Sequence, residues 1–196
     1  MSIRTAKLLL VVTVLSGFSL ATSTAFGATG DSRIGIFAGT SSLRAGDDTT
    51  TGTTVGVGWG LEIQEQLLWN ITASHTATDG ERESGGQIYP ITADTNNLQT
   101  GLTQFFRPGK TLIPFTGGGI SLAAYDVDYT YPDSAVGKST GTSPGLFARL
   151  GMELRFSRNF TLIPQYHLSV HSIRSDKGDS RSLISDGLLL SLRFST

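Results

Sequence analysis

Hydrophobic and polar residues alternate with a period of two along several segments of the chain. In one such segment the apolar residues Val55, Val57, Trp59, Leu61 and Ile63 are interleaved with glycine and polar residues. Because successive side chains of a strand point to opposite faces, this pattern predicts a strand with one apolar and one polar face. Similar stretches recur along the chain, which predicts an all-β protein.

The segment 146–156 shows the clearest alternation. Its even-numbered positions, from Leu146 to Phe156, are all apolar, whereas the other face carries Arg149, Glu153 and Arg155. Charged side chains at this density do not fit the dry core of a soluble barrel, which would direct apolar residues inward. The pattern favours the opposite arrangement, a transmembrane β-barrel with a lipid-facing wall and a polar lumen.

Turn signals and polar stretches divide the chain into eight candidate strands. Short connections are expected at 64–66, 107–110 and 157–159, and long polar loops at 45–53, 77–93, 132–143 and 174–182. This alternation of short and long connections predicts an eight-stranded, antiparallel, closed barrel with a short periplasmic side and four longer extracellular loops. The face assignment of the strand at 112–131 stays open, since Gly117–Gly119 could mark a bulge or a close approach.

A barrel of eight strands has an interior that its own side chains fill, so a porin-like channel is not expected. The inward positions predict a polar lumen network of Asn70, Arg149, Glu153, Arg155, Gln165 and Arg193. The residues expected to face lipid include Val55, Val57, Trp59, Leu61, Leu150, Leu190 and Phe194.

The N-terminal segment predicts export. Arg4 and Lys7 precede an apolar stretch, and small residues around Gly27 offer a cleavage site. We therefore expect a cleaved signal peptide at 1–27 and one barrel domain at 28–196; a retained membrane anchor is the alternative.

Composition narrows the classes of function. The chain has no cysteine and a formal net charge of -1. These features argue against a disulfide framework and a thiolate metal site, and give no electrostatic basis for binding nucleic acid. No phosphate loop, zinc spacing or calcium loop is present, so no cofactor and no metal are expected.

Several segments resemble a known group. The segment Leu112–Gly119 is similar to the PYVGAGxG segment of small OmpA-like, OmpX-like and OmpW-like outer-membrane barrels, and 151–166 is similar to a hairpin of the same group. The segment Leu188–Phe194 resembles their C-terminal assembly signal. The resemblance implies the outer membrane of a Gram-negative bacterium, contact with its lipids and lipopolysaccharide, and recognition by the assembly machinery through the last strand.

One local cluster could carry chemistry. His167 and Ser169 resemble the His-x-Ser pair of PagL-like lipid A deacylases, in which serine is the nucleophile and histidine its base. The match departs at Val170, where that family has asparagine, and no glutamate follows Glu153 to orient the base. The alternation also predicts that both residues face the lumen, away from lipid acyl chains, unless a bulge after Pro164 changes the parity.

These observations favour a non-catalytic barrel that contributes to envelope integrity or to surface interactions through an unidentified ligand. A lipid A deacylase using Ser169 and His167 is the first alternative. An OmpW-like conduit for small apolar molecules is the second; it would need an apolar lumen pocket, which the charged face of 146–156 disfavours.

Overall fold

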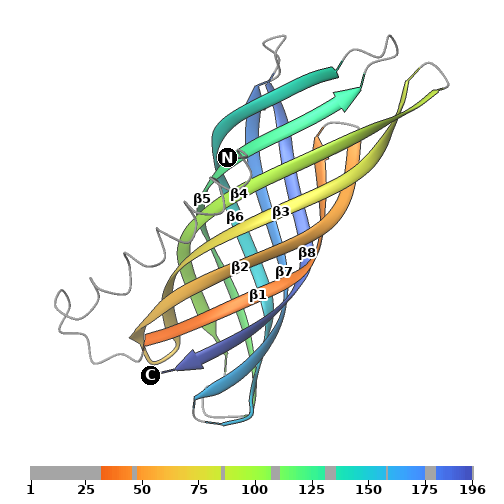
Figure 1. Ribbon diagram of the computed structural model, residues 1–196. Coiled ribbons are helices and arrows are strands. Elements are labelled where there is room, and N and C mark those ends of the chain that lie inside the picture. The colour runs from red at the N-terminus through yellow and green to blue at the C-terminus, as the bar shows by residue number, and fades with distance from the viewer. Residues whose placement is uncertain are drawn as a thin grey trace, which may run out of the picture. The chain divides into compact units, whose positions relative to one another are not determined.

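Eight antiparallel strands form a closed barrel in the computed structural model (Figure 1). The structure describes residues 32–45, 48–84, 87–106, 111–130, 136–157, 159–174 and 180–195. The predicted signal peptide at 1–27 and the predicted turn at 107–110 lie outside these residues. Within the described ranges, no helix is long and apolar enough to cross a membrane.

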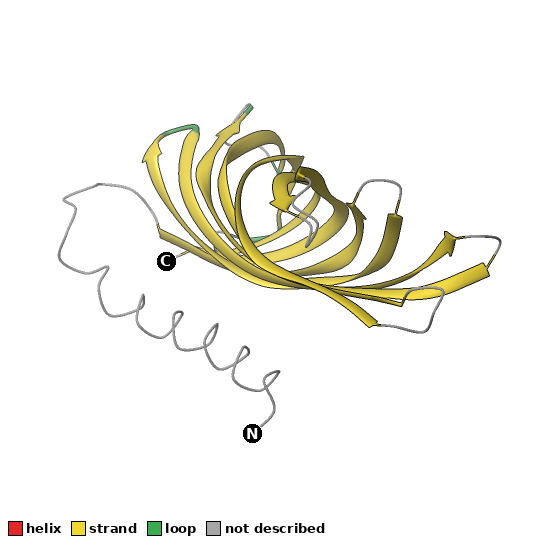
Figure 2. Ribbon diagram, turned by 90° about the horizontal axis from the view of Figure 1, so that it is seen from above, coloured by secondary structure: helices red, strands yellow, loops and turns green. Residues whose placement is uncertain are grey.

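Each strand pairs with its neighbours in the chain, and the last pairs with the first, which confirms the predicted fold class. Figure 2 shows that strands and short connections make up the described chain. The strands are β1 Ser32–Ala45, β2 Asp48–Gln64, β3 Leu67–Ser84, β4 Gln87–Phe105, β5 Leu112–Thr130, β6 Val136–Arg155, β7 Phe160–Arg174 and β8 Ser180–Ser195.

The register around the barrel sets how its residues meet. Stepping from Ile34 to its paired residue on the next strand, and so on once around the barrel, leads back to β1 at Arg44. This residue is ten positions further along the strand than the starting point. Such a stagger accompanies strands tilted to the barrel axis. As a consequence, side chains that are distant in sequence lie at the same height inside the lumen.

Alternate residues of each strand face the lumen and the outer wall. In β5 the odd positions on both sides of the glycines are buried, Ile113 and Phe115 before them and 121 to 127 after them, so the parity does not change at the glycines. A Cβ atom at Gly117 would lie 3.1 Å from Arg149 Nε, and one at Gly119 would lie 2.9 Å from Phe147 Cε1. The glycine run is therefore a site of close approach that admits two large side chains of β6.

Strands extend into all four polar segments predicted as loops, which corrects the predicted boundaries of those loops. The strand β1 continues to Ala45 and β2 begins at Asp48; likewise, β3 continues to Ser84 and β4 begins at Gln87. In the other two segments, β6 already begins at Val136 and β8 at Ser180. Threonine favours strands, and paired hydroxyl groups satisfy each other inside the barrel. Such hydrogen bonds join Ser41 to Thr54 (2.6 Å), Thr54 to Thr76 (2.7 Å) and Thr50 to Thr78 (2.7 Å).

Candidate functional site in the barrel lumen

A buried ion cluster occupies one side of the lumen near its periplasmic end. The carboxylate of Glu153 in β6 is only 1 % exposed and lies 3.5 Å from guanidinium nitrogens of both Arg33 and Arg155. It also accepts a hydrogen bond from Arg193 of β8. Arg33 in turn pairs with Glu62 of β2 at 2.6 Å. Four strands thus contribute three arginines and two glutamates to one cluster below the middle of the barrel.

An apolar cluster fills the lumen beside these charges. It consists of Leu68, Phe105, Ile113, Phe115 and Ile163, all of which are buried. The guanidinium carbon of Arg33 lies 5.5 Å from the ring centre of Phe105, a distance that allows a cation–π contact. The ion cluster and the apolar cluster together obstruct the lumen toward the periplasm.

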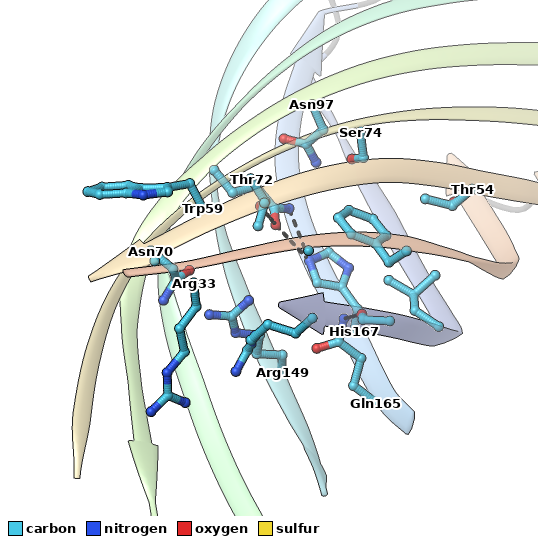
Figure 3. A pocket seen from close by; sticks show the side chains of 18 of the residues that line it. Arg33, Thr54, Trp59, Asn70, Thr72, Ser74, Asn97, Arg149, Gln165 and His167 are labelled. Carbon is cyan, nitrogen blue, oxygen red and sulfur yellow. Dashed lines mark hydrogen bonds between the residues drawn. The ribbon is translucent and has the colours of Figure 1, made fainter. Parts of the chain in front are cut away.

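A polar cavity of about 60 Å³ lies within the lumen. Figure 3 shows Arg33, Arg149, Gln165 and His167 around this space. The Nε2 atom of His167 is 3.0 Å from Gln99 Nε2 and 3.1 Å from Gln99 Oε1, so the side chains are within hydrogen-bond distance. Gln165 donates a hydrogen bond to Ser191 at 3.1 Å.

Thr103 of β4 joins two of the predicted lumen residues. Its hydroxyl oxygen accepts hydrogen bonds from the guanidinium of Arg149 and, at 3.1 Å, from Asn70 Nδ2. Asn70 also donates to the backbone oxygen of Gly101 at 2.9 Å. The Arg149 contact joins β6 to β4 past the intervening β5, whereas the Asn70 contacts add to the pairing of the neighbouring strands β3 and β4.

The six predicted lumen residues therefore separate into two groups. Glu153, Arg155 and Arg193 meet in the ion cluster, whereas Asn70, Arg149 and Gln165 make other contacts. The sequence interpretation missed Arg33 and Glu62 as members of the ion cluster. Glu62 lies on the polar face of the alternating segment 55–64, so the alternation alone could have predicted that its side chain points into the lumen.

The strand β7 keeps a single parity past Pro164. His167 and Ser169 face the lumen, as does His171, whose Nε2 lies 3.4 Å from Ser121 Oγ. Ser169 is 1 % exposed, and its hydroxyl group has no hydrogen-bond partner. Among the described residues, no group of three or more His, Cys, Asp or Glu side chains is placed to hold a metal ion.

A second apolar cluster lies inside the barrel toward the extracellular end. Residues from β1, β4, β5 and β8 form it. Its buried members are Leu43, Ile91, Ala93, Tyr125, Val127 and Leu183. The polar cavity therefore lies between an apolar cluster above and the ion and apolar clusters below.

The outer wall is apolar over a broad band. Ile34, Ile120, Leu146 and Leu188 expose more than half of their surface there, as expected of a lipid-facing surface. The aromatic ring of Phe160 contacts those of Phe156 and Phe194 near the periplasmic end. Of the residues predicted to face lipid, Val55, Leu150, Leu190 and Phe194 are exposed, whereas Val57, Trp59 and Leu61 are half-buried.

A polar group interrupts the outer wall near the upper edge of this band, where β8 meets β1. Asp186 accepts hydrogen bonds from Ser42 Oγ at 2.7 Å and from Tyr166 Oη at 3.1 Å. Arg44 lies 3.6 Å from the same carboxylate. These contacts connect β7, β8 and β1 and so reinforce the seam at which the barrel closes.

The paired strands β3–β4 and β5–β6 (Figure 1) extend beyond the apolar band, and outward residues of β5 and β6 there are charged. Lys138 lies 2.9 Å from Asp126 and 3.5 Å from Asp128. The hydrogen bond to Asp126 is the main cause that raises the pKa of Lys138 above its ordinary value. The charges agree with an aqueous setting for this end of the barrel.

An apolar outer wall around a side-chain-filled lumen is the geometry of a transmembrane β-barrel. The family model described as outer membrane protein beta-barrel domain matches residues 9–183. The chain belongs to this family, and the protein is located in the outer membrane of a Gram-negative bacterium. A search of curated proteins found no match.

Solved structures share the fold at low sequence identity. Neisserial surface protein A has a TM-score of 0.57 and 13% identity, over 83% of this chain and 96% of that chain. OprG from Pseudomonas aeruginosa has a TM-score of 0.57 and 9% identity, over 88% of this chain and 99% of that one. A major outer membrane protein from Thermus thermophilus has a TM-score of 0.53 and 10% identity, over 84% and 99%.

Proposed function

We propose that this protein is a non-catalytic outer-membrane barrel that supports envelope integrity and presents an extracellular β-structure for surface interactions. The observation that carries the proposal is the filled lumen: the ion cluster around Glu153 and the apolar cluster around Ile113 obstruct it toward the periplasm. A barrel obstructed in this way acts through its outer wall and its extracellular end rather than as an open pore.

The extracellular end supplies the surface for such interactions. The hairpins β3–β4 and β5–β6 continue beyond the apolar band as paired strands, with register pairs as far as Ser84 with Gln87 and Thr130 with Val136. Paired strands hold outward side chains in fixed positions, so a ligand meets an ordered surface. The lipids and lipopolysaccharide of the membrane contact the apolar band, and assembly through the C-terminal strand β8 is part of the proposal.

The geometry disfavours the deacylase alternative. A lipid A deacylase has to present its nucleophile to an acyl chain outside the wall, whereas Ser169 is buried inside it. Its hydroxyl group also lacks the hydrogen bond to a histidine that activates a serine nucleophile. The conduit alternative is disfavoured as well, because Arg33, Arg149 and Arg193 line the lumen cavity.

Two measurements test the absence of catalysis and transport. Mass spectrometry of lipid A from a Gram-negative host that expresses the protein should show no lost acyl chain, with Ser169→Ala as the matched variant. Liposomes containing the purified protein should not swell faster in neutral solutes than protein-free liposomes. Acyl-chain loss that depends on Ser169, or rapid swelling, would overturn the proposal.

The extracellular role is tested by shortening one hairpin at a register pair. Replacing 127–139 with Asn-Gly leaves Asp126 opposite Thr140, as in the intact protein. In cells lacking the native gene, both the intact protein and the shortened one should restore detergent resistance if the barrel alone supports the envelope. Adhesion to a surface should be restored by the intact protein only. Failure of the intact protein in both assays would contradict the proposed role.

A further inference from the structure

The lumen cavity is lined by positive charge. Arg33, Arg149 and Arg193 all contribute to its wall. Among the described residues that line the cavity there is no aspartate or glutamate. The side chains of Arg33 and Arg149 are drawn at this space in Figure 3. A cavity with this lining is complementary to an anion.

The three arginines differ in how their charges are compensated. Arg33 and Arg193 pair with Glu153, and Arg33 pairs with Glu62 as well. Arg149 is only 8 % exposed, yet none of the ion pairs formed by described residues includes it. Burying a charge without a counter-charge is costly, so Arg149 is the group in the lumen that most needs an anionic partner.

Arg149 is also held in position for such a partner. Its guanidinium donates to Thr103 Oγ1 and lies 5.9 Å from the ring centre of Phe147, while its Nε atom has no hydrogen-bond partner. The glycine at 117 allows this approach, since a Cβ there would lie 3.1 Å from Nε. Since Nε is enclosed beside Gly117, the donors that remain for a ligand are N–H groups of the terminal guanidinium nitrogens.

We infer that the lumen binds a small inorganic anion at Arg149, next to His167 and above the ion cluster of Glu153. The cavity of about 60 Å³ has room for a monatomic anion or a small oxyanion, with water completing its shell. The bound anion supplies the counter-charge that the protein lacks at this height and stabilises the folded barrel by mass action.

The test compares chloride, phosphate and gluconate at constant ionic strength on the full protein in detergent. Gluconate serves as a large, weakly binding organic reference anion. The urea midpoint of unfolding of the wild type should rise with chloride or with phosphate, and whichever anion acts identifies the ligand. In Arg149→Met, the apparent affinity for that anion should fall by about tenfold or more, because a charge-assisted hydrogen bond is lost.

Lys138→Met is the matched control, because it removes one positive charge from an exposed site outside the lumen. It should retain the full response to the anion. Crystals soaked in bromide give an independent readout: anomalous density next to the Arg149 guanidinium supports the site. Equal anion responses in wild type and Arg149→Met, or bromide density only at exposed residues, would overturn the inference. If Arg149→Met does not fold, Arg149→Gln, which also removes the charge, replaces it.

Discussion

Replacing Glu153 with glutamine should lower the free energy of unfolding by disrupting the ion cluster in the periplasmic half of the lumen. The substitution keeps the shape of the side chain but removes the negative charge that three guanidinium groups share. Arg193 would lose its carboxylate partner, while Arg33 would keep Glu62 at 2.6 Å. The main cost is therefore one buried arginine left without a counter-charge.

The magnitude follows from burial. Breaking a buried ion pair by removing one partner typically costs 3–5 kcal/mol, so about 3 kcal/mol is expected here, since Glu62 still compensates Arg33. Arg155 is 36 % exposed, and its contact with Glu153 at 3.5 Å therefore adds about 1 kcal/mol or less. The matched variant Arg155→Gln should accordingly destabilise the barrel by no more than about 1 kcal/mol.

The assay is equilibrium unfolding in urea with the protein in detergent or lipid vesicles. The fluorescence of Trp59 and Trp69, whose rings contact each other edge to face on the outer wall, reports the loss of the lipid-facing surface. A free-energy loss for Glu153→Gln that is as small as the loss for Arg155→Gln would refute the reasoning. It would show that the cluster is hydrated rather than buried.

Three further results are expected. Gly151→Ala should lower stability by about 1–3 kcal/mol in the same assay, because the new Cβ would lie 2.8 Å from Phe115 Cζ. Gly118→Ala, at an outward position, is the control, and an equal loss of stability in the two variants would contradict the prediction. Ser169→Ala should leave stability unchanged or raise it, since the buried hydroxyl group of Ser169 has no hydrogen-bond partner. Thr103→Val should instead cost about 1–3 kcal/mol, because Arg149 and Asn70 each lose the hydroxyl oxygen of Thr103 as an acceptor. Similar losses of stability in the two variants would argue against these assignments. Asp126→Asn should lower the pKa of Lys138 toward 10.5 in an NMR titration. In the intact pair the raised pKa means that the attraction is present below the unfolded-state pKa and is lost as pH rises through the folded-state value. An unchanged titration would exclude the hydrogen bond as the cause of the raised pKa.

The extent of the strands shows why a correct pattern can give wrong boundaries. The segment 45–53 is polar and rich in threonine, and polarity alone predicts a loop. In the barrel, Thr50 and Thr54 face the lumen and pair with hydroxyl groups of β3. The partners belong to another strand, so local sequence does not reveal that the hydroxyl groups are satisfied.

The pairing inside the lumen shows the same limit for the site. Parity along one strand is sufficient to place Glu153 and Arg149 on the inner face. It does not show that Arg33, 120 positions earlier, reaches Glu153, or that Arg149 bonds Thr103 instead. Those contacts depend on the stagger of the strands, which sets the heights at which inward side chains meet.

The sequence by itself therefore determined the class of protein and the two faces of its wall, because a strand in a membrane must alternate between lipid and lumen at every second residue. Tertiary structure alone decided the length of the paired strands, the obstruction of the lumen and the isolation of Arg149. Each of these depends on closing the ring with β1 against β8, and closure fixes the register of all eight strands at once.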